Sequence, residues 1–261
     1  MIESFRALLD TLAVSFDLPI LDWIAANLWC PVLDAVMPVV TLLGDAGIFW
    51  IAVAVLFIFT RKYRKIGIGM MIALLMGLVV CNICLKPWVA RIRPYDFKEE
   101  HLSIVVNLLI DKQHDFSFPS GHTIASFEAA VVILLGDKKL GIPAMILACL
   151  IAFSRLYLYV HYPTDVIASV ILGSILALIG WLLAQKIMEK LTTLTELRTN
   201  LIVSEQKRGY YNECASYIAA LGEVLESHGK NGSKQALLSA YKSKFPRHSA
   251  FIRELKNYGL K

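Results

Sequence analysis

Long apolar runs alternate with short polar segments along most of this chain. The clearest runs of hydrophobic residues lie at 44–60, 66–85, 119–135, 140–160 and 166–184. Two of them, 66–85 and 166–184, contain no charged residue, and each approaches the ~20 residues that a helix needs to cross the hydrocarbon core of a bilayer. A soluble protein has no use for five such runs, so the pattern predicts an all-α bundle of membrane-spanning helices.

A further apolar segment, residues 18–43, is interrupted by proline and by acidic residues. The interrupting residues are Pro19, Asp22, Pro31, Asp34 and Pro38. Because proline breaks or kinks a helix, the segment fits either one kinked span or an interfacial helix followed by a short buried helix. The residues leave both alternatives open.

The composition changes near residue 191. From there the chain is polar, carries charges of both signs, and has apolar residues at helical spacing within 210–225 and 234–245. The sequence Gly-Lys-Asn-Gly at 229–232 predicts a loop between these two helices. We therefore expect a membrane domain at 1–190 and a small cytoplasmic helical tail at 191–261, whose partner the sequence does not name.

The overall composition supports a membrane protein and argues against a nucleic-acid partner. Hydrophobic residues make up 57% of the chain and charged residues 18%, whereas a soluble domain carries about 25% charged residues. The net charge is +5, but much of the basic charge lies beside the apolar runs, where Lys and Arg commonly flank spans. No basic motif interleaved with aromatic residues is present, so we expect no nucleic-acid binding.

Polar residues suited to phosphate chemistry gather in three motifs at the ends of the runs. The motifs are Lys86 with Arg93-Pro94, then Pro119-Ser120-Gly121-His122, then Ser154-Arg155 with His161 and Asp165. In an antiparallel bundle of consecutive spans, these run ends fall on the same membrane face. One shallow site can therefore collect fixed cations and groups that move protons, which is what a phosphate requires.

The second motif predicts a helix start that binds an anion. Pro119 suits the first helical position, so we expect Ser120, Gly121 and His122 in the first turn. The N–H groups of a first turn have no partner within the helix, and the helix dipole favours negative charge there.

The third motif predicts an oriented histidine. Asp165 follows His161 by four residues, so the two can meet where the last span begins. A carboxylate on one ring nitrogen fixes the histidine tautomer and leaves the other nitrogen free, as in a nucleophile or base with an orienting group. Arg155, Arg93 and Lys86 would bind phosphoryl oxygens.

Other polar residues near the runs receive structural interpretations. We interpret Arg91 as a lipid-headgroup anchor, and His101 and His114 as bystanders in the polar loop. Tyr157, Tyr159 and Tyr162 suggest an interfacial aromatic belt. Glu128 lies inside a span, where an acid is a functional candidate by default, but we interpret it as a structural polar contact.

Together the motifs resemble those of the type-2 phosphatidic acid phosphatases, also called lipid phosphate phosphatases. That superfamily includes glucose-6-phosphatases and vanadium haloperoxidases, and its pattern is K-x6-R-P, P-S-G-H and S-R-x5-H-x3-D. This sequence matches all three motifs without a departure. The resemblance covers roughly residues 20–188 and does not extend to the tail.

The resemblance implies a mechanism and a set of site residues. His161 would attack phosphorus and become phosphohistidine, His122 would protonate the leaving oxygen and later activate water, and Asp165 would orient His161. The phosphate would be held by Lys86, Arg93, Arg155, Ser120 and the Gly121 amide. The resemblance implies no metal and no other cofactor, and it implies a helical bundle of about six spans.

The substrate is expected to be a phosphate attached to a lipid, because the motifs lie at span ends. Bacterial members of similar organisation dephosphorylate undecaprenyl diphosphate, phosphatidylglycerophosphate or phosphatidate, and the compact loops favour the first. A transporter or scaffold with an anion site is the non-catalytic alternative, which would need the cations but not the His161–Asp165 pair. Haloperoxidases are soluble, which argues against that activity.

Charge in the loops predicts the orientation of the chain. Basic residues at 61–65, at 137–139 and at Lys186 and Lys190 lie on the face opposite to the motifs. Short basic loops favour the cytoplasmic side, so we expect the site on the extracytoplasmic side and the tail in the cytoplasm.

Overall fold

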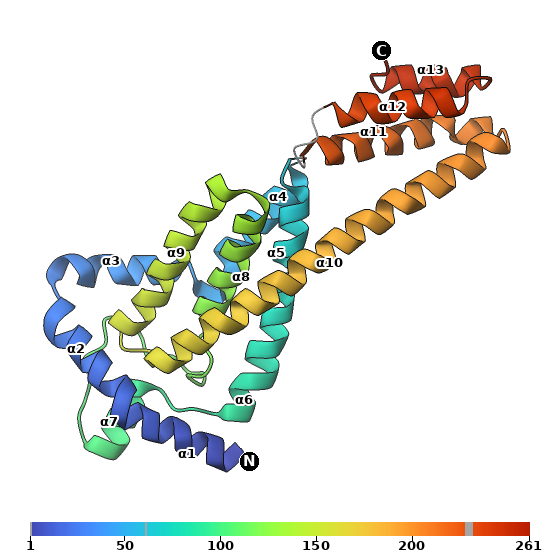
Figure 1. Cartoon of the computed structure of the whole chain (residues 1–261). Coiled ribbons are helices and arrows are strands. Elements are labelled where there is room, and N and C mark those ends of the chain that lie inside the picture. Colours follow the sequence, from blue (N-terminus) through green and yellow to red (C-terminus); the bar gives the residue numbers. More distant parts are fainter. Residues whose placement is uncertain (1, 61, 228–231) are drawn as a thin grey trace. The chain divides into compact units, whose positions relative to one another are not determined.

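The structure is a computed structural model that describes residues 2–60, 62–227 and 232–261. These residues form helices joined by turns and loops, and no β-strand occurs among them (Figure 1). Arg61 of the predicted basic loop and residues 229–231 of the predicted tail loop lie outside the described residues. The expectation of an all-α fold is confirmed.

The chain divides into two compact units. The first comprises Met1–Val55 and Gly69–Leu182, and the second comprises Leu56–Ile68 and Leu183–Lys261. The helices that lie wholly or partly in the first unit are α1 (Ile2–Leu12), α2 (Leu18–Leu28), α3 (Pro31–Leu42), α4 (Ile48–Phe59), α5 (Arg64–Gly77), α6 (Lys86–Val89), α7 (Pro94–Leu102), α8 (Gly121–Gly136), α9 (Lys138–Tyr157) and α10 (Pro163–Ser204). π-helical segments at Ala13–Asp17 and Leu78–Leu85 and a 3-10 turn at Asp45–Gly47 complete this part.

Every predicted apolar run is helical, and the ambiguous segment 18–43 is two helices. The break falls at Trp29 and Cys30, whose backbones are extended, and Pro31 then opens α3. An extended residue before proline is expected, because the proline ring disfavours the helical conformation of its predecessor. Two helices joined at this break fit both alternatives for the segment, a kinked span and an interfacial helix followed by a short buried helix.

Several helices are long and apolar enough to cross a membrane. By length and composition, three helical stretches in the described residues qualify: Arg64–Leu102, Lys138–Tyr157 and Pro163–Ser204. The pair Pro31–Leu42 and Asp45–Phe59, bent by 41°, would add a fourth if it forms one span, and α8 is a shorter apolar helix. The chain is thus a multi-pass membrane protein, with fewer full-length candidates among these residues than the six spans expected.

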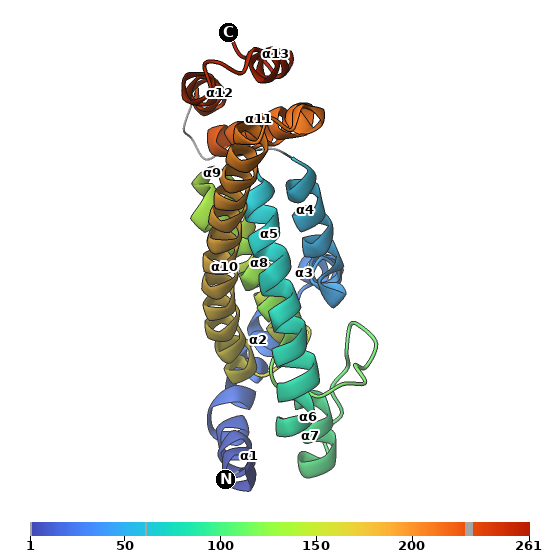
Figure 2. The ribbon, with the colours of Figure 1, turned by 90° about the vertical axis from the view of Figure 1, so that its right-hand side faces the viewer.

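Close helix packing holds the site-bearing part of the first unit together. α8 and α9 form an antiparallel hairpin, and Asp137 between them accepts hydrogen bonds from the amides of Lys139 and Leu140. α10 lies beside both α8 and α5 (Figure 2). A Cβ at Gly173 would come within 2.9 Å of the Ile124 carbonyl of α8, and small residues permit such approach between membrane helices.

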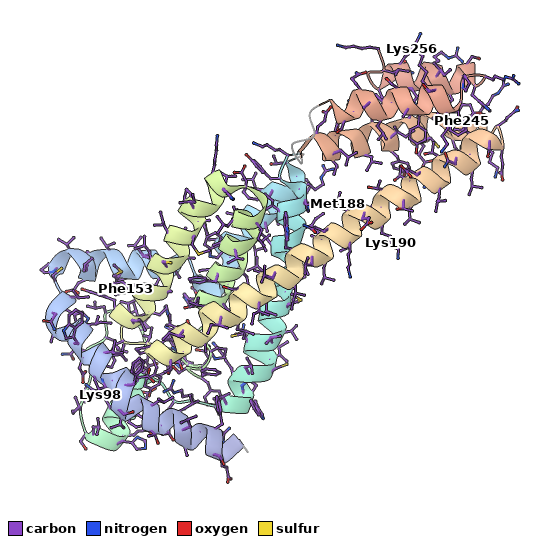
Figure 3. The ribbon with its side chains drawn as sticks, in the orientation of Figure 1. Lys98, Phe153, Met188, Lys190, Phe245 and Lys256 are labelled. Carbon is purple, nitrogen blue, oxygen red and sulfur yellow. The ribbon has the colours of Figure 1, made fainter. Side chains whose placement is uncertain are left out.

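The tyrosines after α9 are buried, so the predicted aromatic belt is wrong. Tyr157, Tyr159 and Tyr162 are at most 2% exposed. The Tyr157 hydroxyl donates to Asp34 at 2.5 Å, and the Tyr159 hydroxyl donates to Asp22 at 2.7 Å. Lys98, labelled in Figure 3, also pairs with Asp22 at 2.5 Å. Asp22 and Asp34, the acidic residues of the apolar segment 18–43, therefore bind α2 and α3 to the part of the chain that carries the third motif.

The second unit has a hydrophobic core of its own. Beyond α10 it contains α11 (Tyr211–Ser227), α12 (Ser233–Lys244) and α13 (Ser249–Asn257), so the two tail helices predicted from the pattern are present. Its buried core includes Cys214, Ile218, Leu238 and Phe251. Phe245, labelled in Figure 3, packs against the same core. α10 runs without a break from Pro163 to Ser204, so no loop separates the helix at residue 190.

Truncation after Lys190 tests whether the membrane part folds without the tail. The truncation removes the whole described core of the second unit beyond α10, while every residue of the three motifs is retained. We expect the shortened protein to insert, to elute as a single species in detergent, and to unfold within a few degrees of the full chain. Aggregation of the shortened protein, with the full chain monodisperse, would contradict this expectation.

Candidate functional site

The three predicted motifs lie in the first unit, each at the end of a helix. Lys86 opens α6, Arg93 caps α7, Ser120 caps α8, Gly121 and His122 begin α8, Arg155 is in the last turn of α9, His161 lies between α9 and α10, and Asp165 is in the first turn of α10. Helix ends carry the backbone groups without helical partners, so this placement gathers both side chains and free amides.

His161 and Asp165 form a buried pair at the start of α10. The distance from His161 Nδ1 to an Asp165 carboxylate oxygen is 3.5 Å, and the two side chains are 2% and 0% exposed. The same carboxylate oxygen accepts the Tyr162 amide at 3.1 Å. Because Nδ1 faces the carboxylate, the free nitrogen is Nε2, which lies 3.3 Å from Arg93 Nη1.

Arg93 and Lys86 are brought together by a residue that the sequence analysis did not single out, Asp115. The Asp115 carboxylate forms an ion pair with Lys86 Nζ and another with Arg93 Nη2. Arg93 is held further by the Asp115 carbonyl at 2.9 Å and the Val160 carbonyl at 2.7 Å. Two cations therefore contact one carboxylate. In this structure the Asp115 carboxylate binds to the two cations as a bound anion would.

The charges around Asp115 keep it ionised. Burial by itself would raise the pKa of this carboxyl, but hydrogen bonds and charge from Lys86 and Arg93 outweigh burial and hold its pKa below the usual value. The carboxylate therefore competes with any other anion for the same two cations over the physiological pH range.

The second motif begins α8 two residues later than predicted, at Gly121 instead of Pro119. Ser120 is the N-cap, with an extended backbone, and its amide donates to Ser169 at 2.8 Å, so Pro119 lies outside the helix. The first turn consists of Gly121, His122 and Thr123, and helix geometry leaves their N–H groups without helical acceptors. Lys86 Nζ lies 3.9 Å from the position of a Cβ at Gly121, so the cation and the helix start face one space.

His122 and Arg155 lie on the side of α3 and the turn after it. The His122 side chain is 16% exposed and its Nε2 is 4.0 Å from Asp45, while a Cβ at Gly44 would approach its ring to 2.9 Å. Arg155 is buried, donates to the Thr41 hydroxyl at 2.5 Å, and has no partner for Nε among the described residues. Arg155 thus keeps an unused donor inside the site.

The electrostatic surroundings make His161 a neutral imidazole. Burial lowers the pKa of His161 well below its ordinary value, and the nearby charges of Arg93, Arg155 and Lys86 lower it further. The neutral ring keeps the lone pair that a nucleophile or a general base requires.

Arg91 is the main residue that the sequence analysis misassigned. It is 4% exposed and cannot be a headgroup anchor. Its guanidinium pairs with Asp165 at 2.5 Å and with Asp17 at 2.8 Å, and it lies 3.7 Å from the centre of the Tyr162 ring. The sequence did contain a signal for this pairing. Asp17 lies next to an apolar segment, and a charge buried there needs a partner of opposite charge such as Arg91.

Ser117 is a second missed residue. Its hydroxyl donates to Asp165 at 2.5 Å and lies 3.4 Å from His161 Nδ1, and its amide donates to the Arg91 carbonyl at 2.8 Å. No spacing rule connects a loop serine to a distant dyad, so only the folded chain reveals this contact.

A cavity of about 700 Å³ opens beside these residues. Lys86, Asp115, Gly121 and His122 line one part of it. The rest is lined by residues of α5, α8, the start of α4, the π-helical segment 78–85, the turn at 44–47 and the loop at 113–116. No group of three or more His, Cys, Asp or Glu residues in the described part of the chain is arranged to hold a metal ion. The functional groups of the site are cations, the carboxylates of Asp115 and Asp165, two histidines, amides and hydroxyls.

Comparison with known proteins finds relatives that are membrane-lipid phosphatases by name. The undecaprenyl-diphosphatase of Sulfolobus acidocaldarius is 37% identical over 126 residues, which are 48% of this chain and 58% of the relative. Phosphatidylglycerophosphatase B of Bacillus subtilis is 32% identical, over 56% of this chain and 72% of the relative. The decaprenylphosphoryl-5-phosphoribose phosphatase of Mycobacterium tuberculosis is also 32% identical, over 50% and 69%. The chain thus spans little more than half the length of some of these relatives.

A solved structure has the same fold. The transmembrane PAP2 type phosphatidylglycerolphosphate phosphatase from Bacillus subtilis superposes with a TM-score of 0.51 at 25% identity, covering 72% of this chain and 94% of the other. The PAP2 superfamily profile matches residues 66–189, which contain all three motifs. By its fold, its motifs and its relatives, this chain belongs to the PAP2 superfamily.

Proposed function

We propose that the protein is a membrane lipid phosphatase that works through a phosphohistidine intermediate. The observation that carries the proposal is the position of His161, whose Nδ1 faces Asp165 while its Nε2 faces the cation Arg93. A transporter or scaffold with an anion site needs the cations but has no use for an oriented, neutral imidazole among them. The same arrangement is what an attacking nucleophile requires.

The residues divide the reaction into two balanced steps. In the first, Nε2 of His161 attacks phosphorus, the bond to the leaving oxygen breaks, and His122 gives that oxygen a proton. In the second, His122 takes a proton from water, the water oxygen attacks phosphorus, and the bond from phosphorus to His161 breaks. Lys86, Arg93 and Arg155 neutralise the phosphoryl oxygens, because phosphoryl transfer depends mainly on positioning and charge stabilisation.

The remaining contacts prepare the site for this reaction. The amide of Gly121 and the cap residue Ser120 lie where the start of α8 favours an anion. Asp165 stabilises the positive charge that His161 acquires on attack. Asp115 gives up Lys86 and Arg93 when phosphate enters, since both cations now contact its carboxylate.

For the substrate, we propose undecaprenyl diphosphate, which would yield undecaprenyl phosphate and inorganic phosphate. The undecaprenyl-diphosphatase at 37% identity supports this substrate. Phosphatidylglycerophosphate or phosphatidate is the alternative, supported by the phosphatidylglycerophosphatase at 32% identity. In either case the leaving group is part of a membrane lipid, which agrees with motifs at the ends of apolar helices.

The proposal is tested by purified full-length protein assayed against a panel of lipid phosphates and against glucose 6-phosphate. We expect long-chain substrates to have the higher specificity constants, chelator to leave turnover intact, and vanadate to inhibit. His161→Ala, His122→Ala and Asp165→Asn should each lower turnover by orders of magnitude, because they remove the nucleophile, the acid and the orienting group.

Each variant must insert and elute like the wild-type protein for this comparison to count. Turnover of His161→Ala near the wild-type rate would refute the nucleophile assignment. A higher specificity constant for glucose 6-phosphate than for every lipid would refute the lipid substrate.

The lowered pKa of His161 predicts a pH-dependent stability. The folded state binds fewer protons than the unfolded state below about pH 6.5, the ordinary pKa of histidine. The stability that accompanies the neutral ring is therefore complete above this pH and is lost as pH falls toward the folded-state pKa, by up to about 1.4 kcal/mol per pH unit.

We expect His161→Asn to lose less stability than the wild-type protein between pH 7 and pH 5. The measurement is denaturant unfolding in detergent at each pH, for both proteins. Parallel losses of the free energy of unfolding in the two proteins would show that His161 is not buried as a neutral ring.

We propose that the site faces away from the cytoplasm and that the domain at 191–261 is a cytoplasmic tail. The support is the basic loop at 61–65 and the basic pair Lys138 and Lys139, which lie on loops opposite to the motifs in chain order. No motif residue lies beyond Asp165, so we propose that the tail serves docking or assembly rather than catalysis.

Cysteine labelling in intact cells tests this orientation. Single cysteines replace Lys62 or Asp111 in a background that lacks the five native cysteines. We expect a membrane-impermeant thiol reagent to label position 111 and to spare position 62 until the membrane is permeabilised. Labelling of position 62 alone would place the chemistry inside the cell.

A further inference from the structure

The cavity beside the phosphate-binding residues continues along α8 to a buried acid, Glu128. Gly121, Ala125 and Glu128 all line it, and their spacing of four and then three residues places them on one helical face. Helix geometry puts Glu128 about 10 Å along the axis from Gly121. The carboxyl group lies against Gly77 of α5, which lines the same cavity.

Glu128 has no protein partner that explains it. The residue is 1% exposed, and its Oε1 has no hydrogen-bond partner among the described residues. The nearby hydroxyl of Ser126 on α8 accepts a hydrogen bond from the Trp50 indole of α4 at 3.0 Å, and Glu128 takes no part in this bond. The structural polar contact expected for Glu128 is therefore not formed at Oε1, and an unpaired buried carboxyl is costly in a membrane protein.

The opposite wall is shaped to admit this carboxyl. A Cβ at Gly77 would lie 2.2 Å from Glu128 Oε1, so the glycine allows the carboxyl to lie directly against α5 in its present position. Gly77 also ends α5, and the π-helical segment Leu78–Leu85 starts at the next residue. Met71, Leu74 and Leu78 make the wall around Glu128 largely apolar, whereas charged and polar residues such as Lys86, Asp115 and His122 line the phosphate end of the same cavity.

The cavity lies on the leaving-group side of the reaction. His122 lines it, whereas His161 is 1% exposed and does not. In the proposed mechanism, which this inference presupposes, His122 protonates the leaving oxygen. The part of the substrate that departs therefore extends from His122 into the chamber that ends at Glu128.

We propose that Glu128 is a specificity residue that binds a hydroxyl group on the leaving portion of the substrate, a few bonds from the phosphoester. A neutral hydroxyl supplies the missing hydrogen bond without adding positive charge. The protein thereby accepts hydroxylated lipid phosphates in preference to those with a purely hydrocarbon leaving group of the same length. Among the substrates proposed above, this preference favours phosphatidylglycerophosphate, whose leaving portion carries a hydroxyl near the phosphoester, over undecaprenyl diphosphate, whose leaving portion carries none.

The test compares two substrates that differ in one hydroxyl. Full-length protein in detergent is assayed with a 1-acylglycerol 3-phosphate and with its 2-deoxy analogue. We expect the wild-type specificity constant to be about tenfold higher for the hydroxylated lipid, because a site with a buried polar group rejects a ligand that leaves it unpaired.

Variants at position 128 identify the source of the preference. Glu128→Leu should bring the ratio of the two specificity constants to about one while the rate on the deoxy lipid is maintained, and Glu128→Gln, which still accepts a hydrogen bond, should keep most of the preference. Ser126→Ala is the matched control, since it removes a buried polar group of α8 outside the cavity lining and should leave the ratio unchanged.

The outcomes separate this inference from the proposed function. Equal specificity constants for the two lipids in the wild-type protein, or an undiminished preference in a folded Glu128→Leu variant, would overturn the role of Glu128 while leaving a lipid phosphatase. Absence of hydrolysis of every lipid phosphate, with the protein folded, would overturn the function itself.

Discussion

The first unit depends on the burial of one negative charge, the carboxylate of Asp165. An ionised carboxylate without partners is unstable in a protein interior, so the chain must bring compensating groups to it. Arg91 supplies a cation, Ser117 a hydroxyl and Tyr162 an amide, from three different parts of the sequence. Asp17 then balances the second side of Arg91 and also accepts the amide and hydroxyl of Thr164. The start of α10, the loop before α8 and the N-terminal segment are thus joined through a single charge.

The same arrangement decides how strongly Asp165 acts on His161. Removing one partner of a buried ion pair leaves an uncompensated charge, which is far more damaging than never burying the pair. Arg91 takes one carboxylate oxygen, so His161 interacts with the other oxygen in competition with Ser117. The ring is oriented without being forced into the charged form. Structural support and chemical tuning are provided by one set of contacts.

The sequence predicted the helices and the motif residues well, because both rest on local rules. Apolar runs fix where helices lie, and motif spacing placed Lys86, Gly121 and His161 at helix ends as observed. The residues that were misassigned or missed, among them Arg91, Ser117 and Asp115, make contacts 22 to 74 positions away in the chain. Side-chain contacts over such separations follow from packing and leave no periodic trace. The prediction that Pro119 is the first residue of the helix was wrong for a related reason. The Ser120 amide donates to Ser169 of α10, and the helix begins after Ser120.

The loop carboxylate of Asp115 acts as a tethered competitor. It is bound to the same Lys86 and Arg93 that a phosphate would need, and its side chain is 52% exposed, so it can withdraw into water. A tethered group competes at an effective concentration in the millimolar range, whatever the concentration of the protein. Free phosphate in dilute solution therefore competes poorly with Asp115 for Lys86 and Arg93. A lipid confined to the bilayer beside the site reaches a local concentration comparable to that of the tethered carboxylate. On the proposed function, Asp115 would displace inorganic phosphate from Lys86 and Arg93 after hydrolysis.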